Sequence, residues 1–375
     1  MSTQQTNLQV QLTAWFMRRT PSGGVRRVAS IAAALGTDVG EIRNENQDRI
    51  AIARGRDRQQ RPFVVAALAD GIGGMRHGSE CAALALGSFI GTVAHEAMVS
   101  DDPRLWLIRG IDDANNDVHE ESHGEGGSTL AAVLFLGDGS IHWTSVGDSR
   151  VYVARDPDLL QLSIDDTIAG QLGRAGDVGH EQSKLIQFIG IGEALETTVS
   201  DLHRGTDSAV FLTTDGVHFL DSTQWFSQLI KHALDPGTCV RRLIELSRWC
   251  GGPDNASTAM ISLAGSIDES MPQIEGCIEV WDPFGELQVI VKMPKVSSAP
   301  VSPGLQKDPD AILALPSADY SPDRESQRGA ESSVSQMKSP SPRKGKSAEK
   351  ARKAEKAKDN PDAPQLLIEF PNKTS

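Results

Sequence analysis

The sequence has few cysteines, four in 375 residues, and none of them lies in a CxxC pair or another metal-binding spacing. This spacing argues against a cysteine-ligated metal site. Cys81, Cys239 and Cys250 each fall within an apolar helical pattern. The pattern predicts buried free thiols, and we therefore expect a protein of the reducing cytoplasm.

Long hydrophobic runs are also missing. No segment approaches roughly 18 uninterrupted apolar residues, the length needed to cross a bilayer, so we expect no membrane span. Residues 7–19 are too short and too polar for the hydrophobic core of a signal peptide. The sequence thus predicts a cytoplasmic protein with no membrane partner.

Positive charge is scarce outside one segment. The formal net charge is -13, yet residues 338–358 carry nine Lys and Arg against two Glu. The rest of the chain is therefore strongly acidic. An acidic body argues against a nucleic-acid partner and suits a protein that attracts divalent cations.

The order of apolar runs predicts an α+β fold. Short turns between successive strand-like runs favour antiparallel sheets, and helices placed before and after them would cover both faces. We therefore expect a four-layer α/β/β/α sandwich over residues 29–265, after a polar leader at 1–28 whose apolar residues 12–17 pack on the domain. The strand-like runs are 28–36, 49–54, 62–69, 128–136, 140–146, 149–155, 208–214 and 257–263, and the helical patterns are 79–99, 103–121, 223–234 and 238–250.

Three further segments follow this domain. Residues 271–294 alternate apolar and polar residues around Asp-Pro-Phe-Gly, which predicts a β-hairpin extension. Residues 295–363 are rich in Pro, Ser and Lys and are predicted to be a disordered basic tail. The apolar segment 364–375 is a candidate docking peptide that adds a strand to a partner, or merely a C-terminal remnant.

Four aspartates lie where an apolar run meets a turn: Asp48, Asp70, Asp215 and Asp254. Converging carboxylates repel one another unless cations lie between them, which predicts two divalent ions held by oxygen ligands. The alternative is that each is a turn residue, since Asp-Gly is a common hairpin turn and Asp138-Gly139 has that context.

The order of the motifs resembles that of the metal-dependent protein phosphatase family, the protein-phosphatase-2C type, in its bacterial form. The resemblance covers about residues 30–265. The motifs that carry it are Arg43 with Asn46-Gln47-Asp48, Asp70 to Gly74, Gly127-Ser128-Thr129, Gly147 to Arg150, Asp215-Gly216 and Asp254-Asn255.

The resemblance implies a ligand set for two Mn²⁺ or Mg²⁺ ions. Asp70 would bridge both ions, and Gly71 would bind one through its carbonyl oxygen. Asp215 and Asp254 would complete the shell of the other ion, and Asp48 would act through bound water. In that arrangement Asn255 lies outside the ligand shell and orients a metal-bound water.

The same resemblance implies the activity. A serine/threonine protein phosphatase would attack phosphoserine or phosphothreonine with a hydroxide that bridges the two ions. Arg43 and Asp70 would be the catalytic residues, with Arg43 binding the phosphate. The partners would be phosphorylated proteins and a cognate serine/threonine kinase. The alternatives are a small-molecule phosphoesterase and a catalytically silent scaffold that binds a kinase or a phosphoprotein.

Three departures from the family pattern concern the surroundings of these residues. Ile72 stands where animal members have a His proposed as the general acid. A third ion, which relatives bind through the equivalent of Asp148 and a second Asp, would be weak here because Phe219 occupies that second position. The segment 167–182 predicts a short flap and an open cleft.

Overall fold

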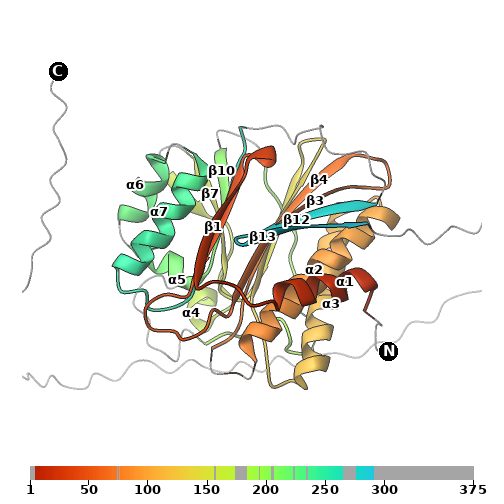
Figure 1. Cartoon of the computed structure of the whole chain (residues 1–375), viewed down its shortest axis with the longest axis horizontal. Coiled ribbons are helices and arrows are strands. Elements are labelled where there is room, and N and C mark those ends of the chain that lie inside the picture. Colours follow the sequence, from red (N-terminus) through yellow and green to blue (C-terminus); the bar gives the residue numbers. More distant parts are fainter. Residues whose placement is uncertain are drawn as a thin grey trace, which may run out of the picture. The chain divides into compact units, whose positions relative to one another are not determined.

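The computed structural model describes residues 5–73, 75, 77–155, 158–173, 184–193, 195–203, 207–222, 224–233, 235–264 and 276–290. The predicted disordered tail at 295–363 and the docking peptide at 364–375 lie outside this part of the chain. Within it, two antiparallel sheets lie face to face with helices on both outer sides (Figure 1). The predicted α+β sandwich is confirmed.

Every strand pairing in the two sheets is antiparallel. One sheet has six strands in the order β1-β2-β11-β10-β7-β8, and the other has seven in the order β13-β12-β3-β4-β5-β6-β9. The six-stranded sheet contains β1 (Gly23–Val28), β2 (Ala33–Asp38), β7 (Arg150–Arg155), β8 (Asp158–Gln161), β10 (Asp207–Thr213) and β11 (Ala256–Ser262). The seven-stranded sheet contains β3 (Asp48–Arg56), β4 (Pro62–Asp70), β5 (Leu130–Leu136), β6 (Ile141–Val146), β9 (Ser200–Asp201), β12 (Cys277–Asp282) and β13 (Gly285–Ile290).

The middle of strand β3, residues 50–53, is apolar at every position instead of alternating. Ile50 and Ile52 face the core between the two sheets, whereas Ala51 and Ala53 face the core under the helices. Successive strand residues point to opposite faces of a sheet. This stretch is covered on both faces, so both sets of side chains are apolar.

Helices α2 (Gly78–Val99) and α3 (Pro103–Ser122) belong to the helical layer of the seven-stranded sheet. The predicted start of α3 is confirmed, because Asp102 accepts a hydrogen bond from the Arg104 amide and Pro103 occupies the first turn. By length and composition α2 is apolar enough to span a membrane, but 83% of its most apolar stretch is buried inside the protein. Packing accounts for that apolarity.

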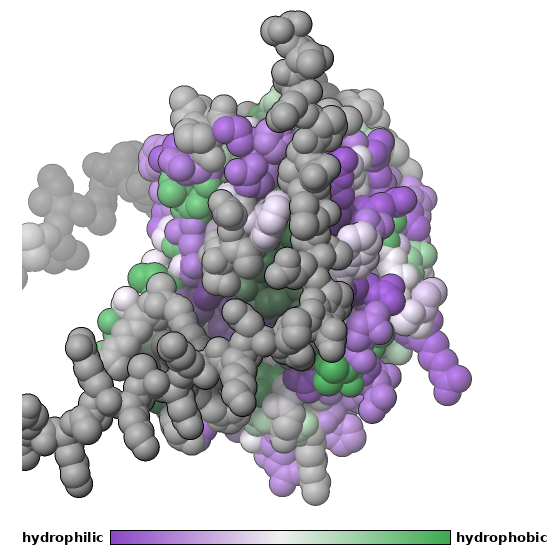
Figure 2. Space-filling model, turned by 90° about the vertical axis from the view of Figure 1, so that its left-hand side faces the viewer, coloured by the Kyte–Doolittle hydropathy of each residue, from purple (hydrophilic) through white to green (hydrophobic). Residues whose placement is uncertain are grey.

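Short and medium helices cover the six-stranded sheet. These are α5 (Asp215–His218), α6 (Gln224–Lys231) and α7 (Pro236–Trp249), and two 3-10 turns lie at Ala29–Ile31 and Phe219–Ser222. Helix α4 (Ile168–Gln171) is a single turn. The coloured surface in Figure 2 is mostly hydrophilic, and its hydrophobic residues form small separate groups.

The segment predicted as a polar leader contains both a helix and a strand. Helix α1 (Asn7–Phe16) buries Leu8, Leu12 and Phe16, and these residues join the core that includes α2. A Cβ atom at Gly87 of α2 would lie 2.4 Å from Thr13 Oγ1, so a glycine is needed for this close approach of the two helices. Of the apolar residues expected to pack on the domain, Leu12 and Phe16 are buried, whereas Met17 is 44% exposed.

The cysteine prediction holds in part. Cys81, Cys239 and Cys277 are buried free thiols, but Cys250 is exposed, so the prediction for that residue was wrong. Cys250 follows the last residue of α7. The helix itself ends at Trp249, although the apolar helical pattern continues to Cys250.

Candidate active site

The pairing of β3 with β4 brings the first two aspartates together. Asp48 begins β3 and Asp70 ends β4, and the two residues are direct partners in the antiparallel register. Gly71 follows at the same edge, where a Cβ atom would lie 2.1 Å from the Gly78 carbonyl oxygen. Only glycine fits there.

The other sheet supplies the second pair. Asp215 begins α5, two residues after the end of β10, and Asp254 lies two residues before β11, which is the antiparallel neighbour of β10. Asp148 lies in the turn between β6 and β7, where Gly147 has a φ of 97° that suits glycine. One edge shared by the two sheets therefore gathers these carboxylates.

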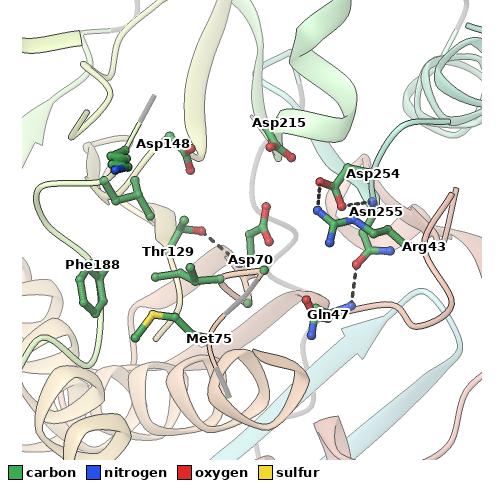
Figure 3. Close-up of a pocket in the computed structure, with 15 residues that line it drawn as sticks. Arg43, Gln47, Asp70, Met75, Thr129, Asp148, Phe188, Asp215, Asp254 and Asn255 are labelled. Carbon is green, nitrogen blue, oxygen red and sulfur yellow. Dashed lines mark hydrogen bonds and ion pairs between the residues drawn. The ribbon is translucent and has the colours of Figure 1, made fainter. Parts of the chain in front are cut away.

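A cavity of about 530 Å³ lies at this edge. Figure 3 shows Asp70 near its centre, with Asp254 on one side, Asp148 on the opposite side and Asp215 between the two. Met75 and Phe188 lie on the side away from Asp254. Asp48 is not one of the residues that line this cavity, and it is buried.

The clustered carboxylates repel one another. Burial and the charges of Asp48 and Asp215 raise the pKa of Asp70 well above its ordinary value. Burial and the charge of Asp148 raise the pKa of Asp215 to about 8. The carboxyl lines the open cavity, but the surrounding protein still displaces much of its water. Burial also raises the pKa of Asp148 to about 6. These charges need compensation if all are ionised near neutral pH.

Asp48 carries an unsatisfied atom. Its Oδ2 accepts a hydrogen bond from the Thr214 hydroxyl at 3.0 Å, but its buried Oδ1 has no hydrogen-bond partner. A buried carboxylate oxygen without a partner is costly. It suits a water or cation that would stand between Asp48 and the cavity.

Arg43 reaches the cavity from the loop before β3. Its guanidinium forms an ion pair with Asp254 at 2.6 Å, and this hydrogen bond raises the pKa of Arg43. A Cβ atom at Gly73 would lie 3.2 Å from the guanidinium, so Arg43 also borders the glycine-rich loop after Asp70. The side chain is 42% exposed, which leaves donors available at the mouth.

Asn255 holds the loop that carries Asp48. Its Oδ1 accepts the Gln47 amide at 2.8 Å, and its Nδ2 donates to the carbonyl oxygens of Val39 and Glu45, both at 2.9 Å. We expected this amide to orient a water molecule. The structure shows it bonded to three backbone groups, and the water contact stays a prediction.

Ser128 and Thr129 support Asp70 in a way that the sequence did not reveal. The Asp70 amide donates to Thr129 Oγ1 at 3.0 Å, and the Ser128 hydroxyl donates to the Asp70 carbonyl at 2.9 Å. The Gly-Ser-Thr motif marked these residues, but nothing in its wording gave their role. Lys184 and Phe188, which line the cavity, were also not singled out.

Two of the three departures from the family pattern, Ile72 and Phe219, differ in their relation to the cavity. Ile72 lines the cavity, whereas Phe219 is 37% exposed and is not one of the lining residues. His218, next to Phe219, is buried, and burial lowers its pKa well below the ordinary value. A third ion at Asp148 stays a prediction.

The oxygen donors at the cavity fit hard divalent cations, although the protein side chains alone do not complete a coordination shell. Across the described residues, no group of three or more His, Cys, Asp or Glu side chains is placed to hold an ion by itself. The carboxylates that repel one another, the unpartnered Asp48 Oδ1 and the Gly71 carbonyl are all oxygen donors. Mg²⁺ and Mn²⁺ prefer such donors and retain water ligands.

Two stacked antiparallel sheets with Arg43 and clustered carboxylates at a shared edge agree with the arrangement that the resemblance to the metal-dependent protein phosphatases implies. The chain belongs to the protein phosphatase 2C family, whose family model matches residues 42–249.

Individual relatives agree with this membership. The chain is 26% identical over 243 residues to the protein phosphatase PhpP of Streptococcus pneumoniae, a match covering 61% of this chain and 96% of PhpP. It is 29% identical over 264 residues to the serine/threonine protein phosphatase PstP of Mycobacterium tuberculosis, covering 65% of this chain and 48% of PstP. The crystal structure of the PPM Ser-Thr phosphatase MsPP from Mycobacterium smegmatis, in complex with cacodylate, aligns with a TM-score of 0.51 and 29% identity, covering 62% of this chain and 97% of MsPP.

Proposed function

We propose that this protein is a serine/threonine protein phosphatase that uses two divalent cations, Mn²⁺ or Mg²⁺. The observation that carries the proposal is the convergence of Asp70, Asp215 and Asp254 with Arg43 in one open cavity. The names of PhpP, PstP and MsPP support the reaction class. The proposed ligands are Asp70, Gly71, Asp215 and Asp254, with Asp48 acting through water and Asp148 as a weak third-site ligand.

The cations, when bound, would acidify a water molecule and neutralise phosphoryl oxygens. The chain's own residues do the rest. Asp70 is fixed through its backbone by Ser128 and Thr129, so its carboxylate is held toward the centre of the cavity. Arg43 offers a planar set of donors that suits a phosphate dianion. No histidine stands at position 72, so a water molecule in the cavity would protonate the leaving alkoxide.

The proposed substrates are phosphorylated proteins, and a cognate serine/threonine kinase would produce them. Four free cysteines fit the proposed cytoplasmic location. Ile72, Met75, Leu185 and Phe188 line the same cavity as the carboxylates. They give it an apolar wall, which suits side chains that flank a phosphorylated residue better than it suits a small polar phosphoester.

The test is turnover of a phosphothreonine peptide by the full chain with Mn²⁺, with EDTA as the control. We expect hydrolysis that EDTA abolishes and added Mn²⁺ restores. Turnover of p-nitrophenyl phosphate without any turnover of phosphopeptides would favour the small-molecule phosphoesterase. Failure to hydrolyse either substrate would favour the silent scaffold.

A further inference from the structure

Two segments outside the family-matched residues 42–249 pack against each other. One is residues 7–22, which contain α1, and the other is the hairpin formed by β12 and β13 at residues 277–290. We call them together the terminal clasp. They come from opposite ends of the described chain, red and cyan in Figure 1.

The Arg18 side chain joins the two halves of the clasp. Its guanidinium forms an ion pair with Asp282 at 2.6 Å and donates to the Trp15 carbonyl at 2.7 Å. The guanidinium carbon also lies 3.7 Å from the centre of the Trp15 ring. The Asp282 side chain is only 6% exposed, so this pair is largely shielded from water.

The turn of the hairpin holds Asp282 in place for its contact with Arg18. Asp282 Oδ1 accepts the amides of Phe284 at 2.8 Å and Gly285 at 2.7 Å, which fixes the turn. A Cβ atom at Gly285 would lie 2.8 Å from the Trp15 ring, so the glycine permits the close approach of α1. The two halves of the clasp are therefore complementary in shape and in charge.

The clasp is anchored to the strand that begins with Asp48. Strand β12 pairs with β3, and Glu279 lies opposite Arg54 in the register. These two side chains form an ion pair and are 8% and 9% exposed, respectively. The hairpin thus extends the seven-stranded sheet directly beside β3.

Arg49 links the other half of the clasp to Asp48. Its Nε donates to the Phe16 carbonyl, at the end of α1, at 2.7 Å. One of its terminal nitrogens donates to the carbonyls of Asn46 at 2.9 Å and Asp48 at 2.8 Å. A single guanidinium therefore holds the end of α1 and both ends of the turn at 46–48. Lysine could not make these contacts together, because its ammonium is a compact point donor.

We propose that the terminal clasp positions Asp48 through Arg49, and that it thereby sets the affinity of the adjoining cation site. Groups that orient a ligand from behind commonly change metal affinity by about 10- to 100-fold. Arg18, Arg49 and Asp282 are positioning residues here, since none of them lines the cavity. This inference rests on the proposed function, because it requires the cation site.

The first test is Mn²⁺ binding by calorimetry to the full chain carrying Arg18→Ala. We expect affinity to fall by about 10-fold, because α1 would lose its hold on the hairpin and Arg49 its fixed acceptor. Arg104→Ala is the matched control. Arg104 also pairs with an aspartate, Asp201 at 2.7 Å, and donates to a backbone carbonyl, that of Val199. The Arg104→Ala variant should have a lower melting temperature and an unchanged Mn²⁺ affinity.

Two further variants keep the inference testable if Arg18→Ala fails to fold. Asp282→Asn preserves an acceptor for the turn, and Arg49→Lys preserves the charge; both should weaken Mn²⁺ binding. Arg18→Ala combined with Asp282→Asn should lower Mn²⁺ affinity no more than the stronger single change does, because both substitutions remove the same interaction.

The inference is overturned if the clasp variants melt at lower temperature but bind Mn²⁺ as tightly as wild type, as expected of Arg104→Ala. The clasp would then be a structural contact only. The proposed function is judged separately on the wild-type protein. A wild type that neither binds Mn²⁺ nor hydrolyses phosphopeptides would overturn that function, whereas an active wild type with unaffected clasp variants overturns the clasp alone.

Discussion

Asp70 and Asp48 are partners in one register but have different surroundings. Asp70 has both backbone groups engaged, because Thr129 Oγ1 accepts its amide proton and its carbonyl accepts the Thr129 amide proton at 2.8 Å. Its carboxylate faces the cavity. Asp48 is 3% exposed and is bonded through one carboxylate oxygen to Thr214. The two residues can therefore be separated by mutation.

Asp70→Asn should abolish Mn²⁺-dependent phosphatase activity and leave the protein folded. The substitution removes the central negative charge while keeping the size of the side chain. The loss in kcat/KM should be about 1,000-fold or more, which corresponds to about 4 kcal/mol of transition-state stabilisation. Turnover of a phosphothreonine peptide measures the loss, with circular dichroism as the fold control. Near-wild-type turnover would refute the assignment of Asp70 to the cations.

Arg43→Ala should raise KM for a phosphopeptide more than it lowers kcat. The ground-state phosphate already carries the charge that Arg43 would bind, so this interaction is made before the transition state. Arg43→Lys should recover only part of the loss, since lysine lacks the planar pair of donors. Steady-state kinetics at saturating Mn²⁺ separate the two parameters. An unchanged KM in the alanine variant would leave Arg43 as a partner of Asp254 and nothing more.

At the scale of elements, contiguous apolar strands could be predicted from sequence and short polar ones could not. Strands β4 and β5 stand out because both of their faces are buried. Strand β1 reads Gly-Gly-Val-Arg-Arg-Val and lies at a sheet edge, so it was placed in a polar leader. Strands β8 and β9 have four and two residues, too few to show a period.

The residues of the site also fall into those that the sequence predicted and those that only the structure revealed. The aspartates and Arg43 belong to local motifs, and the register of β3 with β4 brings Asp48 and Asp70 together. The contact between Arg49 and Phe16 joins residues 33 positions apart. A side-chain hydrogen bond to a distant carbonyl leaves no trace in local sequence, so this part of the site required the structure.

The hairpin gives a prediction about stability. Glu279→Ala should destabilise the protein by about 3–5 kcal/mol, because it leaves the Arg54 charge buried without its partner. Arg27→Ala, at an exposed pair with Asp235, should cost about 1 kcal/mol or less and serves as the control. Urea denaturation measures both. Equal small losses would show that the hairpin contributes little to the fold.

At the scale of the whole molecule, the clustered carboxylates should make stability depend on pH and on metal together. The pKa values of Asp48 and Asp215 are raised to about 7 and about 8, chiefly by burial. Between the ordinary carboxyl pKa and these values, the folded protein binds more protons than the unfolded chain. Stability without metal must then fall as pH rises through this window.

We therefore expect the melting temperature in EDTA to decrease steadily from pH 5 to pH 8. Saturating Mn²⁺ should raise it more at pH 8 than at pH 6, because the cation replaces the protons that the carboxylates have lost. Asp148→Asn should flatten the EDTA curve, since Asp148 contributes to the repulsion at Asp215. Differential scanning calorimetry measures all three curves. A melting temperature in EDTA that stays constant or rises over this range would mean that these carboxylates are already compensated within the protein, and the electrostatic case for a cation site would fail.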